Sequence, residues 1–163
     1  MSVGGLTVDP VTKTPIVVLR DADNKLNLPI WIGLLEATAM ATEIEGIKMA
    51  RPMTHDLLRS TLAALGATVE SVEVNDLREN TYFALVHLRH GDRSLMIDAR
   101  PSDAIAMALR TRCPIYVAKA VLEQSSVLQQ AEEGEEQNLS NVSPEKWADI
   151  LDKMGPDDFK YKM

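Results

Sequence analysis

Hydrophobic and polar positions follow two different periods along most of the chain. Short β-branched or alternating runs, typical of strands, occupy residues 16–19, 28–32, 68–74, 81–88, 94–98 and 115–118. Apolar residues at helical spacing favour helices at residues 34–47, 54–66 and 102–110. Turn-forming residues at 21–24 and 90–93 join neighbouring strands, so each of two hairpins is followed by a helix. The pattern therefore predicts an α+β fold.

The two hairpin-and-helix units resemble each other when they are aligned at an offset of 67 residues. The matched pairs are Leu28 and Leu95, Ile30 and Ile97, Glu36 and Asp103, and Met40 and Met107. We therefore expect an internal duplication of a β-hairpin/helix unit, forming mixed sheets packed with helices. Glu36 and Asp103 either approach each other about a pseudo-twofold axis or are unrelated acids, each favoured by its own helix dipole.

Composition divides the chain into three parts. Residues 1–123 carry the apolar patterns and are expected to form one domain. Residues 124–142 are too acidic and polar to be buried, which predicts a flexible linker. In residues 143–163, Ser143 is a suitable N-cap and Pro144 a suitable first helical residue, so a short helical tail is expected there.

The charge of the chain is unevenly distributed. The formal net charge is -7 over 163 residues, but residues 120–163 hold ten acids and four bases, which leaves residues 1–119 with a net charge of -1. The acidic total and the 4% aromatic content argue against avid binding of nucleic acid, whereas the arginines of the main domain leave room for a local basic patch. No apolar run approaches the roughly 20 residues of a membrane span, so we expect a cytoplasmic protein with no membrane partner.

The densest polar chemistry lies where the strand at 94–98 gives way to the helix at 102–110. Asp98, Arg100, Ser102 and Asp103 fall within six residues there, beside the free N–H groups of a helix start. At the matching positions of the first unit stand Trp31 for Asp98 and Gly33 for Arg100, so the polar chemistry belongs to the second unit. This junction is the predicted site.

Three interpretations of the junction stay open. In the first, Asp98 and Asp103, with Glu36 or Asp56, supply the oxygen ligands that Mg²⁺ or Mn²⁺ prefers. In the second, His55 is a general base, and Arg51 and Arg100 bind phosphate. In the third, which is purely structural, Arg100 pairs with Asp98 or Asp103 to fix the strand to the helix, and Asp103 complements the helix dipole.

Four blocks of the sequence, in order, resemble the bifunctional nuclease domain family. They are Leu28-Pro29-Ile30-Trp31-Ile32-Gly33 with Glu36-Ala37, Arg51-Pro52-Met53-Thr54-His55-Asp56-Leu57, Glu79-Asn80-Thr81-Tyr82-Phe83-Ala84, and Ile97-Asp98-Ala99-Arg100-Pro101-Ser102-Asp103-Ala104-Ile105-Ala106. The resemblance covers roughly residues 6–125 and implies a duplicated α+β fold, a homo-oligomer, and cleavage of RNA and DNA. It carries no agreed set of catalytic residues.

Two functions follow as hypotheses. The first is a nuclease that hydrolyses phosphodiester bonds of RNA or DNA, with a divalent cation as an optional cofactor. Its catalytic candidates are His55, Asp98, Arg100, Ser102 and Asp103, and in its metal-dependent form Asp98→Asn or Asp103→Asn abolishes cleavage. The second is a non-enzymatic oligomeric adaptor that binds a protein partner or a small ligand.

Overall fold

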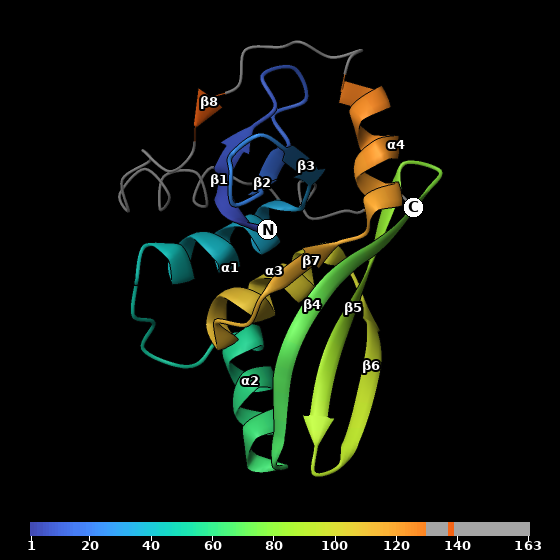
Figure 1. The fold of residues 1–163 in the computed structure, drawn as a ribbon. Helices are drawn as coiled ribbons and strands as arrows, with labels where there is room; N and C mark the ends of the chain where they lie inside the picture. The colour runs from blue at the N-terminus through green and yellow to red at the C-terminus, as the bar shows by residue number, and fades with distance from the viewer. Residues whose placement is uncertain (130–136, 139–163) are drawn as a thin grey trace.

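The computed structural model describes residues 1–129 and 137–138, and it has an α+β fold (Figure 1). Its helices are α1 (Leu34–Ile44), α2 (Thr54–Ala64), α3 (Pro101–Thr111) and α4 (Lys119–Gln129). Its strands are β1 (Ser2–Val8), β2 (Pro15–Arg20), β3 (Asn27–Trp31), β4 (Ala67–Arg78), β5 (Thr81–His90), β6 (Arg93–Ala99), β7 (Ile115–Val117) and β8 (Gln137–Asn138). Among the described residues, no helix has the length and apolar character to cross a membrane.

The strands form two sheets of four strands each. One has the order β3-β2-β1-β8 and is antiparallel throughout. The other has the order β6-β5-β4-β7, in which β7 runs parallel to β4 and the remaining pairs are antiparallel. The α-amino group of Met1 donates to the carbonyl of Ile115 at 2.6 Å, which ties the start of β1 to β7 of the other sheet.

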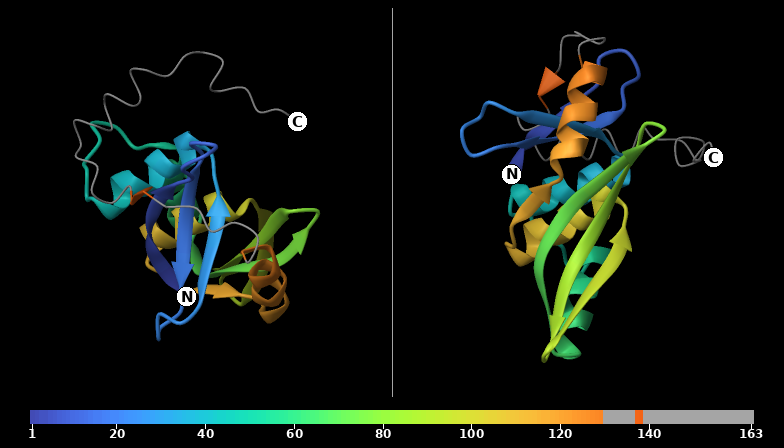
Figure 2. Two further views of the ribbon diagram at one scale, coloured as in Figure 1. Left: turned by 90° about the horizontal axis from the view of Figure 1, so that it is seen from above. Right: turned by 45° about the vertical axis from the view of Figure 1, so that its right-hand side comes forward.

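Two helices lie between the sheets and join them into one core. α1 packs on β2, α3 packs on β4 and β5, and the two helices contact each other (Figures 1 and 2). Small side chains at this contact let the helix backbones approach closely, because Ala37, Ala104 and Ala108 are almost completely buried. The site described below sits at the ends of these helices, where α2 also meets α3.

The strands and helices predicted from the pattern are confirmed, and the structure adds β1, β8 and α4 to them. α4 was not predicted, and it extends through residues 124–129 of the expected linker. The apolar side of α2 is only partly covered: Leu62 packs against the core, whereas Leu57, Leu58 and the adjoining Leu65 are 44–67% exposed, and α2 has no buried residue. Helical periodicity shows which side of a helix is apolar, but it does not show what packs there. The expected tail at 143–163 lies outside the described residues.

The internal duplication is not confirmed. Positions matched by the offset differ in burial: Leu28 and Ile30 are at most 2% exposed, whereas Leu95 and Ile97 are 43% and 48% exposed. β3 and β6 are both outer strands of their sheets, and the difference arises because the core covers the side chains of Leu28 and Ile30 but not those of Leu95 and Ile97. The duplication stays a prediction.

Candidate functional site

Arg100, the residue immediately before α3, binds a carboxylate from each of two helices. Its Nε and Nη2 donate to Oδ2 and Oδ1 of Asp103 at 2.8 and 3.2 Å, and its Nη1 lies 2.9 Å from Oε1 of Glu36 in α1. Such a forked contact is the strongest form of carboxylate pairing. The two matched first-turn acids therefore meet at one guanidinium, and Arg100 joins the starts of α1 and α3.

His55, in the first turn of α2, adds a third helix to this group. Its Nε2 lies 3.1 Å from Oδ1 of Asp103, and its side chain is only 12% exposed. An ionised carboxylate only accepts hydrogen bonds, so a neutral His55 donates Nε2–H to Asp103 and keeps its lone pair on Nδ1. The sequence proposed His55 and Asp103 separately, and the fold brings them together across 48 positions.

The electrostatic surroundings of Asp103 keep it ionised. The hydrogen bond from His55 is the largest effect, the bonds from Arg100 add to it, and together they outweigh partial burial and lower the pKa of Asp103 to about 2. At neutral pH, Asp103 is therefore a fixed negative charge. A carboxylate in this state orients an imidazole and stabilises the imidazolium that forms when the ring takes a proton.

Arg110, near the end of α3, binds the residue that follows His55 in the first turn of α2. Its Nε donates to Oδ1 of Asp56 at 2.7 Å, and its Nη1 and Nη2 donate to the carbonyls of Ala106 and Ala39 at 3.1 and 3.0 Å. The side chain of Arg110 is 2% exposed, so these contacts are largely desolvated. Asp56 also accepts the backbone N–H of Met53 at 3.0 Å, which caps α2.

Burial raises the pKa of Asp56, but the hydrogen bonds from Arg110 and Met53 outweigh it and leave the pKa below its ordinary value. Asp56 is therefore held as an anion by Arg110 and the helix cap. His55 is its direct neighbour in α2, so the contacts of Asp56 hold the imidazole in place against Asp103.

The other predicted site residues lie elsewhere. Asp98 stands opposite Leu85 in the β5–β6 ladder and is exposed, whereas its neighbours Ile97 and Ala99 stand opposite the buried Val86 and Ala84, on the face that packs against α3. Asp98 therefore points to the other face of the sheet, away from Asp103. Ser102 is 8% exposed in the first turn of α3, and its catalytic role stays a prediction.

The four carboxylates expected to bind a divalent cation do not converge. Glu36 and Asp103 both bind Arg100, Asp56 binds Arg110, and Asp98 faces away. Among the described residues, no group of three or more His, Cys, Asp or Glu side chains has the arrangement of a metal site. Dependence on Mg²⁺ or Mn²⁺ therefore stays a prediction from the sequence.

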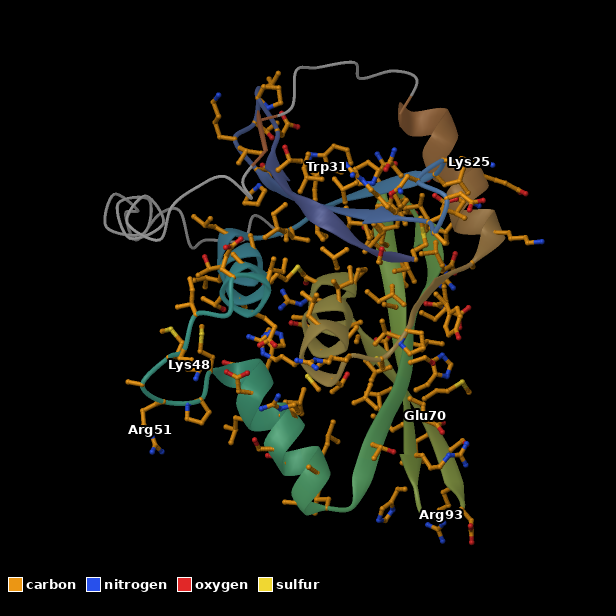
Figure 3. All side chains as sticks on the ribbon, turned by 60° about the vertical axis from the view of Figure 1, so that its left-hand side comes forward. Lys25, Trp31, Lys48, Arg51, Glu70 and Arg93 are labelled. Carbon is orange, nitrogen blue, oxygen red and sulfur yellow. The ribbon has the colours of Figure 1, made fainter. Side chains whose placement is uncertain are left out.

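Arg51 lies in the loop that joins α1 to α2 (Figure 3). This loop and the facing sides of α1 and α2 form a shallow depression of about 360 Å³. Its charged lining consists of Lys48, Arg51, Arg59, Arg110, Glu43 and Asp56. Arg59 is one of the arginines for which the sequence left room for a local basic patch, whereas Lys48 was not predicted, although Lys48 and Arg51 are closely spaced in the sequence.

Fold and site together define the class: an α+β domain in which a histidine and a carboxylate are joined across two helices. Residues 17–130 match the sequence profile of the bifunctional nuclease domain, and the chain belongs to that family. This confirms the resemblance seen in the four sequence blocks.

Known relatives agree with the family assignment. An uncharacterized protein of Mycobacterium tuberculosis strain H37Rv is 42% identical over 158 residues, which are 96% of this chain and 94% of that protein. Bifunctional nuclease 2 of Oryza sativa subsp. japonica and bifunctional nuclease 2 of Arabidopsis thaliana are both 29% identical, over 72% and 71% of this chain. The matched parts are 37% and 36% of those plant proteins, so the chain corresponds to about a third of their length.

Proposed function

We propose that this protein is a nuclease that hydrolyses phosphodiester bonds of RNA or DNA, with His55 as the general base. The observation that carries the proposal is the 3.1 Å contact between His55 Nε2 and Asp103, in a chain of the bifunctional nuclease domain family. Asp103 is itself fixed by Arg100. The base lies in α2 and the orienting carboxylate in α3. This is the arrangement that makes a histidine an effective base.

The proposed reaction needs only a water molecule and the phosphodiester. Nδ1 of His55 takes a proton from the water, the water oxygen bonds to phosphorus, and the bond between phosphorus and the leaving sugar oxygen breaks. The leaving oxygen takes a proton from solvent or from the imidazolium, which yields a phosphomonoester and a free hydroxyl group. Because the attacking group is water rather than the ribose 2′-hydroxyl, the same chemistry serves RNA and DNA.

Self-association is part of the proposal, and the partner is a second copy of this chain. β6 is the outer strand of its sheet and exposes Leu95, Met96 and Ile97 in succession. An exposed apolar edge strand readily pairs with another strand. Antiparallel pairing of two β6 strands centred on Met96 sets each Leu95 beside the partner's Ile97, and this register keeps matching faces of the two sheets together.

The function is tested with His55→Gln, which removes the base while keeping a polar side chain of similar size. His90→Gln is the matched control, since His90 is exposed at the end of β5 and takes no part in the network. Cleavage of labelled single-stranded RNA and DNA by highly purified protein is measured with and without a chelator. We expect His55→Gln to lose about 100-fold or more of the rate and His90→Gln to keep it.

An equal rate in His55→Gln and the parent protein would remove His55 from the mechanism. A complete absence of cleavage by the parent protein, with the oligomer intact, would favour the adaptor function instead. In that case the exposed edge of β6 would still serve self-association, in a protein that catalyses no reaction.

A further inference from the structure

The depression beside α2 holds an excess of positive charge in an acidic protein. Arg110 does not contribute to this excess, because Asp56 at 2.7 Å neutralises it and both Nη atoms donate to backbone carbonyls. The remaining charged lining is Lys48, Arg51 and Arg59 against the single carboxylate of Glu43. The depression therefore carries net positive charge although the whole chain has a formal charge of -7.

These cations have donor groups available for an anion. Lys48, Arg51 and Arg59 are all exposed. Within the described part of the chain, no carboxylate forms an ion pair with Lys48 or Arg51. Arg59 donates one hydrogen bond, from Nη1 to the carbonyl of Arg110 at 3.4 Å, and interacts electrostatically with Asp56 without forming an ion pair to it. Three exposed cations on one depression are the groups that contact successive phosphates of a nucleic acid backbone.

Apolar side chains alternate with the cations on the same loop. Ile47 and Met49 are 37% and 52% exposed, and Pro52 and Met53 also line the depression. A free phosphate makes no apolar contacts with such side chains, whereas the sugar and base of a nucleotide can pack against them.

The depression adjoins the proposed catalytic pair. His55 and Asp56 are consecutive residues of α2, and consecutive helical side chains project about 100° apart. His55 is directed to Asp103, while Asp56 lines the depression. A strand bound in the depression therefore runs past the turn that presents His55.

We infer that the depression formed by the α1–α2 loop and α2 is a subsite for single-stranded nucleic acid, in which Lys48, Arg51 and Arg59 bind the backbone phosphates. The inference rests on the proposed nuclease function, whose substrate it narrows. A single strand is favoured over a duplex because only its unstacked bases and sugars can reach the apolar side chains of the loop.

The test measures binding and not cleavage. A fluorescein-labelled oligothymidylate with phosphorothioate linkages keeps its backbone charge and resists hydrolysis, and its dissociation constant is obtained from fluorescence anisotropy over a series of salt concentrations. Lys48→Ala, Arg51→Ala and Arg59→Ala are compared with the parent protein. Arg93→Ala is the matched control, because Arg93 is an exposed cation at the tip of the β5–β6 hairpin, away from the α1–α2 loop (Figure 3).

For three phosphate contacts, the logarithm of the association constant falls with the logarithm of salt concentration with a slope of about -2, and each single variant reduces the steepness by about 0.7. Arg93→Ala leaves the slope unchanged. The subsite is overturned if the three variants bind as the parent does, or if a duplex of the same length binds as tightly as the single strand. Binding that follows this pattern in a protein that cleaves nothing would refute the nuclease function and keep the subsite.

Discussion

The charge on Asp103 makes a measurable contribution to stability, and Asp103→Asn isolates it. Asparagine keeps the size of the side chain but removes the ionic part of the bonds from Arg100 and His55, while the contact between Arg100 and Glu36 remains. The pKa of Asp103 falls from 3.8 to about 2, which corresponds to roughly 2.4 kcal/mol at about 1.36 kcal/mol per unit. Since the carboxylate is 34% exposed, solvent screening reduces this figure to about 1 kcal/mol.

The sign of the pH dependence follows from the direction of the shift. The pKa of Asp103 is lower in the folded protein than in the unfolded chain, so the stabilisation is complete above the unfolded pKa near 4 and is lost as the pH falls toward 2. Urea unfolding of both proteins at a series of pH values measures this. Asp103→Asn should be less stable by about 1 kcal/mol at pH 7 and nearly equal to the parent at pH 2.

Asp92→Asn is the control for this experiment, because Asp92 is exposed at the β5–β6 turn and should change the stability by less than about 0.5 kcal/mol at any pH. A difference between Asp103→Asn and the parent that stays constant with pH would refute the reasoning. It would mean that the shape of the side chain, rather than its charge, matters at this position.

Three further predictions address the surroundings of the site. Arg110→Met leaves Asp56 and the carbonyl of Ala39 without their buried donor, and should lower the unfolding free energy by about 3 kcal/mol in urea; a loss under about 1 kcal/mol would show that α2 is not held by Arg110. Ile97→Lys places a charge on the edge of β6 and should shift the protein toward monomer in sedimentation velocity, whereas an unchanged sedimentation coefficient would exclude this edge as the interface. Asp98→Asn distinguishes the metal-dependent mechanism from the one in which His55 is the base. We expect this variant to keep the parent's cleavage rate in the presence of a chelator, whereas a lower rate in Asp98→Asn would favour the metal-dependent mechanism.

The regular elements could be predicted from sequence because each depends on neighbouring residues. Strand alternation and helical periodicity located α1, α2, α3 and most strands. α4 was not predicted because its second half, from Gln124, was assigned to the polar linker. The exposure of Leu57 and Leu58 in α2 could not be predicted for another reason: it depends on which surfaces the whole fold leaves uncovered.

The sequence predicted mainly the local contacts of the site, and the approach of Glu36 to Asp103 was one of two alternatives that the comparison of the two units offered. Arg100 and Asp103 are three residues apart at a helix start, and their pairing was one of the interpretations that the sequence offered. The contacts of His55 with Asp103 and of Arg110 with Asp56 join residues 48 and 54 positions apart, so they follow from tertiary packing alone. Asp98 and Asp103, in contrast, are close in sequence but do not meet in the fold. Side chains alternate between the two faces along β6, and Asp98 lies on the face away from α3.

We propose His55, oriented by Asp103, as the base of a phosphodiester hydrolase. The most direct test compares the initial cleavage rates of labelled single-stranded RNA and DNA by the parent protein, His55→Gln and His90→Gln, purified in parallel. We expect cleavage by the parent and by His90→Gln, with a loss of about 100-fold or more in His55→Gln. Equal cleavage by all three proteins, or none by the parent, would contradict it.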